Sequence, residues 1–435
     1  MEKADILIYG CTILPMNGKD CIEDGALAVK NGEITFVGKR SSANKIQAEM
    51  EIDAEKKIAI PGLINCHTHA PMTLFRGIAE DQPLETWLKS TIWPLEAKLK
   101  ANDVYVGALL GCLEMIKSGT TCFADIYFHE DMVAKAVKKS GLRGVLAEGI
   151  IEAGNKAQGE KMLKKSVNFV KNLQGYADGR VTTFLGPHAA YSCSPELLTK
   201  IRNEASELNA GVHIHLAESK QMSKEFEGRH GSSEIEFLDR IGFFKGHVLA
   251  AHCTNVTRKE TRILSRNDVN VAYVPVSNMK LGVGAAKIKD LTGLRINVCL
   301  GTDGPASNNT LDMFETMKTA ALLQKLVYLN PKVLPVYTVL RMATVNGARA
   351  LKLGNSIGSL ETGKKADIIL IDLSKPHLKP LHNICASIVY SVCKTDVDTV
   401  IVDGKVLMKN RQVKTLDEQN LMDKAEETTA DLLSR

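Results

Sequence analysis

Three histidines and one aspartate follow short apolar segments at separate points of the 435-residue chain. His67 and His69 end the first of these segments, and residues two apart on a strand point to the same side. His215 ends a second segment, and Asp303 follows a third. A single pair of histidines two apart is a weak signal, but its repetition at separate segment ends is hard to explain by packing. Three imidazoles and a carboxylate suit a first-row divalent ion such as Zn²⁺.

Two acid or base side chains accompany this set. Glu218 lies three residues after His215, close enough to face the same cavity without being a ligand, and His252 ends a further apolar segment. His213 shares a strand face with His215 but lies one layer deeper, so we expect a hydrogen-bonded structural histidine there. Five histidines outside these segments are expected to be ordinary: His129, His230, His247, His377 and His382.

The elements that must position these side chains alternate between strand and helix. Eight apolar segments are expected as parallel strands: Ile58–Cys66, Thr120–Asp125, Leu142–Glu148, Val181–Pro187, Val212–Ala217, Val248–His252, Val269–Pro275 and Ile296–Thr302. Amphipathic helices are expected between them, for example over Asn102–Ser118, Pro195–Leu208 and Ser232–Ile241. Eight such units in about 300 residues indicate a (β/α)₈ barrel, whose sites lie at the carboxyl ends of the strands.

Both chain ends show a different pattern, of short strands and tight turns. The strands expected there are Asp5–Tyr9, Ala26–Lys30 and Glu33–Val37 near the start, and Ala366–Ile371, Ile384–Tyr390, Val397–Val402 and Lys405–Lys409 near the end. The predicted fold class is therefore α/β, a (β/α)₈ TIM-type barrel with a small composite β-sandwich built from both chain ends. The predicted ranges are 1–57 and 359–411 for the sandwich, 58–358 for the barrel and 412–435 for a C-terminal helix.

Composition narrows the functional class. Hydrophobic residues make up 44% and charged residues 24%, which is ordinary for a globular protein. A net charge of +5 and 5% aromatic residues do not favour nucleic-acid binding. Ten dispersed cysteines indicate reduced thiols rather than a disulfide framework. No secretory signal or long apolar stretch is visible, so we expect a cytoplasmic protein with no membrane partner.

Five strings of the sequence resemble a known family: PGLINCHTHAPMTLFRG, HIHLAES, AHCTN, PVSNMKLG and GTDGPASNN. They are similar to motifs of the amidohydrolase superfamily, and most closely to its branch of 5-methylthioadenosine/S-adenosylhomocysteine deaminases. The resemblance covers essentially the whole chain and keeps the order of the motifs. It implies a metal-dependent barrel hydrolase that acts on C–N bonds of cyclic amidines and removes the amino group of an adenine nucleoside. It also implies a homo-oligomer.

The resemblance implies a role for each matching residue. The residues similar to metal ligands are His67, His69, His215 and Asp303. Glu218 resembles the proton shuttle between water and the ring nitrogen, and His252 the histidine that contacts the attacking water. Asp303 can also accept the proton of that water while it binds the ion. One ion is expected, because the segment 181–188 holds no Lys, Glu or Cys to bridge two. Zn²⁺ is the first choice, and Fe²⁺ and Ni²⁺ also fit the ligand set.

Four further residues are expected to contact the substrate. Glu96 resembles a residue that holds the ribose hydroxyls, and His188 resembles a substrate contact. Trp87 is expected to stack on or wall the purine, although it is equally well explained as a core aromatic. Glu148 stands where many family members carry an arginine. If it faces the pocket, an acidic residue there predicts a preference for uncharged 5′-substituents, as in methylthioadenosine or 5′-deoxyadenosine, over S-adenosylhomocysteine.

Other functions remain open on the sequence alone. Guanine and cytosine deaminases and triazine hydrolases use the same arrangement of metal ligands, so a few changes in the substrate pocket would change the reaction. A non-catalytic metal-binding scaffold is a further alternative. The proton-transfer set of Glu218, His252 and Asp303 argues against a scaffold, because metal binding alone needs no proton relay.

Overall fold

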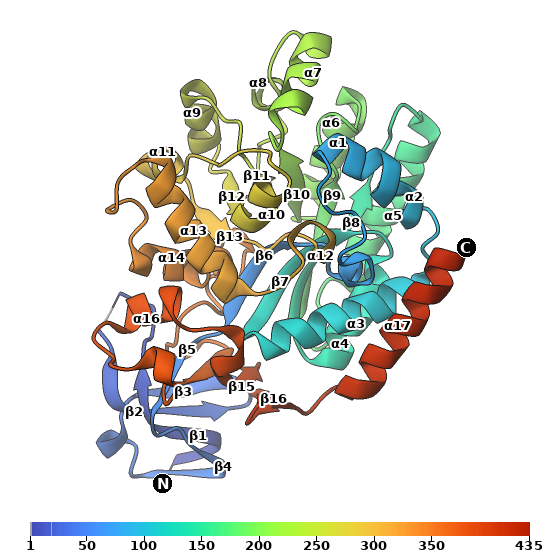
Figure 1. The fold of residues 1–435 in the computed structure, drawn as a ribbon. Coiled ribbons are helices and arrows are strands. Elements are labelled where there is room, and N and C mark those ends of the chain that lie inside the picture. Colours follow the sequence, from blue (N-terminus) through green and yellow to red (C-terminus); the bar gives the residue numbers. More distant parts are fainter. Residues whose placement is uncertain (1, 19) are drawn as a thin grey trace.

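Eight parallel strands form the centre of the protein in a computed structural model that describes residues 2–18 and 20–435 (Figure 1). They are β6 (Leu63–Thr68), β7 (Thr120–Tyr127), β8 (Arg143–Ile150), β9 (Val181–Pro187), β10 (Gly211–Leu216), β11 (Val248–His252), β12 (Asn270–Tyr273) and β13 (Val298–Leu300). Neighbours in this order pair in parallel, and nearly all of these strand residues are buried. The predicted (β/α)₈ barrel is confirmed.

The first and last strands of the barrel meet through a polar clasp. The backbone amide of Asp303 donates to the carbonyl of His67 at 2.9 Å. The side chain of Asn65 accepts from the amide of Thr302 at 3.0 Å and donates to its hydroxyl at 2.7 Å. All these groups are buried, so each donor and acceptor needs the partner that the clasp provides. The clasp fixes the relative height of the two strand ends that carry His67 and Asp303.

Helices surround the barrel and cover one end of it. The outer helices are α3 (Ala101–Lys117), α4 (Glu130–Ser140), α5 (Lys156–Leu173), α6 (Pro195–Glu207), α7 (Lys220–His230), α8 (Glu234–Arg240), α9 (Arg258–Arg266), α11 (Ile288–Gly293), α13 (Met313–Val327), α14 (Val336–Met342) and α15 (Val345–Ala350). Shorter segments follow the carboxyl ends of the strands: η2 (Ala70–Phe75), α1 (Leu84–Thr86), η3 (Trp87–Ile92), α2 (Trp93–Glu96), α10 (Pro275–Lys280) and α12 (Pro305–Asn308). None of the described helices is long and apolar enough to span a membrane.

The segment Ile58–Cys66, expected as one strand, is two strands in different sheets. It divides at Gly62 into β5 (Lys57–Pro61), which joins the smaller sheet, and β6 of the barrel. A Cβ atom at Gly62 would lie 2.0 Å from the hydroxyl of Thr121. Only glycine fits this close approach, and the chain therefore changes sheets there.

The smaller sheet is built from both ends of the chain and lies beside the barrel (Figure 1). Its nine strands are β1 (Glu2–Ile13), β2 (Ile22–Lys30), β3 (Glu33–Lys39), β4 (Ile46–Asp53), β5, β14 (Ile368–Asp372), β15 (Val397–Val402), β16 (Lys405–Lys409) and β17 (Gln412–Val413). The antiparallel pairing of β5 with β14 joins the two chain ends, and Ile8, Leu27, Ile368 and Ile401 form part of the buried core there. The composite origin is as expected, while the four-range domain division stays a prediction.

One predicted strand is a helix. Residues Ile384–Tyr390 form α16, which begins where the side chain of Asn383 accepts a hydrogen bond from the amide of Ala386 at 2.9 Å. A short apolar run does not distinguish strand from buried helix, and here the capping asparagine decides. The expected C-terminal helix is present as α17 (Glu418–Ser434), which packs along α3 (Figure 1). Its end is held by an ion pair between Arg435 and Asp103 at 2.6 Å.

Candidate active site

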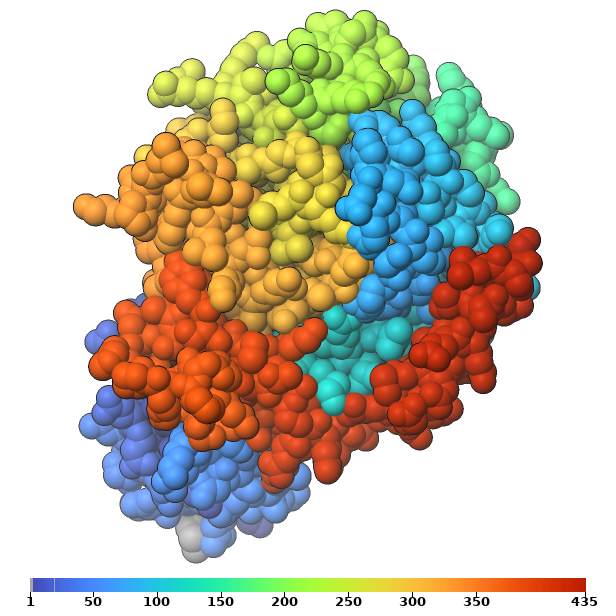
Figure 2. Space-filling view, viewed as in Figure 1, coloured from blue at the N-terminus to red at the C-terminus, as the bar shows by residue number. Residues whose placement is uncertain are grey.

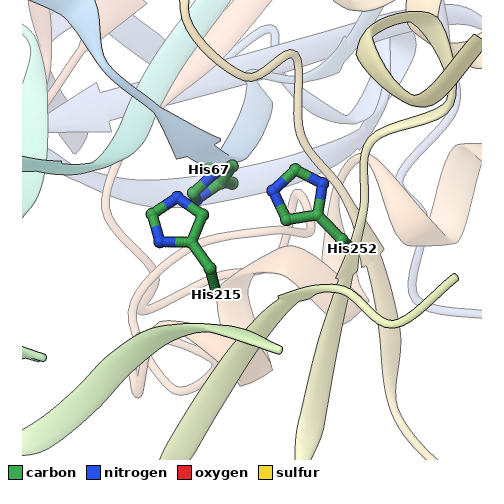
Figure 3. A group of neighbouring side chains, drawn as sticks. All are labelled: His67, His215 and His252. Carbon is green, nitrogen blue, oxygen red and sulfur yellow. The ribbon is translucent and has the colours of Figure 1, made fainter. Parts of the chain in front are cut away.

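The carboxyl ends of four strands bring imidazole and carboxylate groups together. Figure 3 shows the rings of His67 on β6, His215 on β10 and His252 on β11 gathered around one point. The Nε2 atoms of His215 and His69 are 3.3 Å apart. One oxygen of Asp303 lies 3.2 Å from Nε2 of His69 and 3.5 Å from Nε2 of His67. The structure thus brings together the residues that the sequence predicted as a set.

The second ring nitrogens of His69 and His215 are bound to backbone carbonyls. Nδ1 of His69 donates to the carbonyl of Ile126 at 2.6 Å, and Nδ1 of His215 donates to the carbonyl of His188 at 2.8 Å. A carbonyl only accepts, so Nδ1 carries a proton in both rings, and in the neutral form of each ring the lone pair is on Nε2. Both lone pairs therefore point into the cluster, as metal-binding histidines require.

His67 has no such carbonyl, and a deeper histidine holds it instead. Its Nδ1 lies 2.9 Å from Nε2 of His213, which agrees with the structural role expected for His213. The Nε2 atoms of His67 and His252 are buried and have no hydrogen-bond partner. Buried polar atoms without a partner are costly. The nitrogen of His67 and the nearby carboxylate of Asp303 therefore fit a divalent cation, and the nitrogen of His252 fits a water molecule beside it.

Asp303 is held in its ionised form. Its two oxygens accept hydrogen bonds from the hydroxyl of Ser277 at 2.6 Å and from the amide of Gly304 at 2.8 Å. Burial alone would raise the pKa of Asp303, but His67 and His69 hold that pKa well below its usual range. In return, the charge of Asp303 outweighs burial and raises the pKa of His69 to about 9. The site therefore carries a buried negative charge that a cation would stabilise.

The backbone is strained at two of these positions. His252 has φ of 72° and Asp303 has φ of 69°, a region that residues with a Cβ rarely adopt. His252 ends β11, and Asp303 lies three residues after the end of β13. Such strain persists only where surrounding structure enforces it, and it is concentrated at functional sites. It turns both side chains into the cavity.

Glu218 lies beside His252 at the edge of the cluster. Oε1 of Glu218 is 3.7 Å from Nε2 of His252, and the other nitrogen of that ring is 2.9 Å from Oδ1 of Asn278. Burial raises the pKa of Glu218, while His252 lowers it and Asp303 raises it further. A carboxyl group with a raised pKa is suited to exchange protons near neutral pH.

A cavity opens from the cluster. Trp87, on the π-helical turn η3, forms part of its wall and is 6% exposed. Leu84 on α1 and Leu281 after α10 also line it. The corresponding blue and yellow segments meet in the space-filling view (Figure 2). An apolar cavity with few polar groups at its floor is typical of a small-molecule site.

Glu96 and His188 both line this cavity, where the sequence expected substrate contacts. Burial raises the pKa of Glu96 to about 7, and the neighbouring Tyr127 and His69 offset this only in part. Nδ1 of His188 is 3.0 Å from the hydroxyl of Ser192, which fixes the ring. Glu96 and His188 therefore add two polar groups to the lining of the cavity.

Glu148 does not line the histidine-lined cavity. It lines a neighbouring, more open cavity. Its carboxylate accepts the amide of Glu130 at 2.8 Å, at the start of α4, and the ammonium of Lys165 at 2.6 Å. A helix N-terminus and a lysine both compensate a negative charge. The expected repulsion of an anionic substituent by Glu148 therefore loses its physical basis.

Sequence reasoning missed the residues that orient the cluster. Ser277 and Asn278 belong to the string PVSNMKLG, but only the fold shows that they contact Asp303 and His252. Asn65, which precedes His67 by two residues, was also not anticipated. A polar side chain inside an apolar strand is the feature of the sequence that could have identified Asn65.

Fold and site together define a class of protein, a (β/α)₈ barrel with a histidine-rich metal site at the carboxyl ends of its strands. The pattern of the Amidohydrolase family matches residues 58–407. The chain belongs to the amidohydrolase family.

Several known proteins are similar to it. A 5′-deoxyadenosine deaminase of Methanosarcina acetivorans is 48% identical over 433 residues, 99% of each chain. A 5-methylthioadenosine/S-adenosylhomocysteine deaminase of Pelotomaculum thermopropionicum is 45% identical over 434 residues, 99% of this chain and 100% of the relative. The structure of an adenosine deaminase from Xanthomonas campestris with bound zinc matches 100% of both chains, with a TM-score of 0.95 and 33% identity.

Proposed function

We propose that this protein is a metal-dependent hydrolytic deaminase of adenine nucleosides, which releases the inosine analogue and ammonia. The observation that carries the proposal is the placement of Glu218 beside His252, at the edge of a cluster of imidazoles and one carboxylate on the cavity floor. The names of the relatives that are 48% and 45% identical over nearly the whole chain support the adenine nucleoside as substrate.

The proposed ligands of the ion are His67, His69, His215 and Asp303. We propose Zn²⁺, because the ligand set suits it and because the similar adenosine deaminase contains zinc. A bound divalent ion would lower the pKa of a water molecule towards about 7 and thus supply a nucleophile at neutral pH. The fixed tautomers of His69 and His215 prepare both rings for that ion.

The protein's own side chains then move the protons. Asp303, oriented by Ser277, accepts a proton from the attacking water, and His252 orients that water. The water oxygen forms a bond to the purine carbon that carries the amino group. Glu218 delivers a proton to the adjacent ring nitrogen. Asp303 then passes its proton to the amino group, the C–N bond breaks with loss of ammonia, and the proton of the new hydroxyl returns to Glu218. The raised pKa of Glu218 favours the protonated form that donates this proton.

The cavity suggests where the rest of the nucleoside lies. Trp87 forms a wall against the purine, while Glu96 and His188 contact the ribose side of the substrate. The 5′-substituent extends towards the neighbouring cavity, which shares Glu96 and Phe128 with the first. Because Lys165 compensates Glu148, we propose that both uncharged and zwitterionic 5′-substituents are accepted.

A substrate panel tests the proposal. The zinc-loaded protein is given 5′-deoxyadenosine, methylthioadenosine, S-adenosylhomocysteine, adenosine, guanine, cytosine and atrazine, and released ammonia or chloride is measured. We expect kcat/KM for the adenine nucleosides to exceed that for the bases and the triazine by more than about 100-fold, which is ~2.7 kcal/mol of transition-state discrimination. Faster turnover of guanine, cytosine or atrazine would assign another reaction, and no turnover at all would favour a metal-binding scaffold.

A further inference from the structure

Three side chains of different ligand types meet on the surface near the smaller sheet, away from the barrel cavity. His377 lies in η4 (Pro376–Leu378), and Cys393 and Asp396 lie at η5 (Lys394–Asp396). Nε2 of His377 is 2.8 Å from Oδ2 of Asp396, and Sγ of Cys393 is 3.2 Å from the same oxygen. Sγ of Cys393 and Nε2 of His377 are 3.9 Å apart.

We propose that His377, Cys393 and Asp396 bind a second divalent ion of the Zn²⁺ type, with the fourth position open to solvent. Ligand atoms about 2.0–2.3 Å from one tetrahedral ion lie roughly 3.3–3.7 Å from each other. The three separations in this cluster, 2.8, 3.2 and 3.9 Å, lie on both sides of this range, within about 0.5 Å of it. A thiolate, an imidazole and a carboxylate together select a borderline-soft ion such as Zn²⁺ or Co²⁺ over Mg²⁺ or Ca²⁺.

The cluster is accessible and partly preorganised. The side chain of His377 is 45% exposed, whereas that of Asp396 is 2% exposed. Cys393 is the one exposed cysteine among the described residues. The backbone amide of Cys393 donates to Oδ2 of Asp396 at 2.9 Å and fixes the carboxylate in place. An ion therefore has a path to a site whose least mobile ligand is already oriented.

Binding of the ion requires a defined movement of protons. In the structure, Oδ2 of Asp396 accepts from the thiol of Cys393 and lies within hydrogen-bond distance of Nε2 of His377. On binding, the thiol proton passes to solvent. The proton that Nε2 of His377 donates to Asp396 also exchanges with solvent, and the ring then carries its proton on Nδ1 and binds the ion through Nε2. A thiolate and a carboxylate then balance the two charges of the ion.

The ion would connect the two ends of an excursion from the sheet. Residues 377 and 393 flank α16, which packs against α13 and α14 of the barrel (Figure 1). Tying these ends together stabilises the position of α16 between sheet and barrel. The guanidinium of Arg411, which donates to the carbonyls of Lys394 and Val397, adds positive charge nearby. We therefore expect weaker binding here than in the barrel.

Cobalt provides a selective probe, because the barrel site offers only imidazoles and carboxylates. Full-length protein is stripped with a chelator and titrated with Co²⁺, and the thiolate-to-cobalt charge-transfer absorption is recorded with the number of ions bound. We expect wild type to bind two ions and to show the absorption. C393S should bind one ion and lose the absorption, with the second dissociation constant raised by more than about 100-fold.

Two further variants complete the test. H377A should weaken the binding of the second ion in the same way. C385S, which removes a cysteine of α16 outside the cluster, should keep both the second ion and the absorption. Zn²⁺ added beyond one equivalent should raise the Tm of wild type but not that of C393S. Binding of one ion by wild type, or an absorption that survives in C393S, would overturn the proposal and leave only a hydrogen-bonded triad.

Discussion

Oε1 of Glu218 lies 3.7 Å from Nε2 of His252, a separation too long for a direct hydrogen bond and suited to two groups that share one water molecule. Both side chains are nearly inaccessible to solvent, with exposures of 10% and 1%. Asn278 fixes the ring of His252. This pair is where the proposed reaction transfers its protons.

Replacing Glu218 by Gln should therefore abolish turnover without loss of the metal. An amide has the same shape but cannot deliver the proton, so kcat should fall by about 10²–10⁴-fold. Bound zinc, measured on the same preparation, should be unchanged. The control is Glu85→Gln, a nearby carboxylate that accepts from the hydroxyl of Ser219. Full activity of Glu218→Gln would remove the proposed proton shuttle.

Asn278 should act by positioning His252. Asn278→Ala removes the acceptor of the ring N–H, and we expect kcat to fall by roughly 10–100-fold with little change in KM. Asn278→Asp keeps an acceptor oxygen and should restore most of the rate. If both variants lost the same activity, or if only thermal stability changed, a positioning role would be wrong.

Glu96 predicts a pH dependence of substrate binding. Burial raises its pKa to about 7, so the carboxylate that would accept the ribose hydroxyls forms only above neutral pH. KM for 5′-deoxyadenosine should thus fall as the pH rises from about 6 to 8. Glu96→Gln should have a higher KM that is independent of pH in this range. If the KM of the wild type did not change with pH, Glu96 would not be the residue that contacts the ribose.

The Glu96 shift also has a consequence for stability. The pKa of Glu96 in the folded protein exceeds the ordinary value of 4.5, so the native protein binds more protons between these two values. Stability is therefore expected to fall as the pH rises from about 4.5 to 7, and less so in Glu96→Gln. Thermal unfolding of the two proteins across this range measures the difference.

Lys165 should decide how an anionic 5′-substituent is tolerated. Its ammonium compensates Glu148 at 2.6 Å. Lys165→Met exposes that charge to the neighbouring cavity, and the kcat/KM of S-adenosylhomocysteine relative to methylthioadenosine should fall about tenfold, or ~1.4 kcal/mol. The double variant Lys165→Met with Glu148→Gln should recover the wild-type ratio. If neither change affected this ratio of kcat/KM values, the 5′-substituent would bind outside the cavity that Glu148 lines.

The sequence predicted the barrel and the cluster because both depend on local pattern. Apolar segments indicate buried parallel strands. In a barrel, the side chains at the carboxyl ends of these strands lie at the same end, independently of the conformation of the loops. The local pattern does not predict contacts between residues that are far apart in the chain. The clasp of Asn65 with Thr302 spans 237 residues, and the pairing of Glu148 with Lys165 depends on how α5 lies on β8. The helix at Ile384–Tyr390 was missed because a short apolar run fits either structure.

The most direct test of the account is metal-dependent turnover in a variant that keeps only the barrel site. C393S is stripped with a chelator, zinc is added back stepwise, and the deamination of 5′-deoxyadenosine is followed by ammonia release. We predict no measurable turnover in the stripped protein and a linear recovery that ends at one zinc per chain. Turnover by the stripped protein at the rate of the zinc-loaded protein would contradict the account.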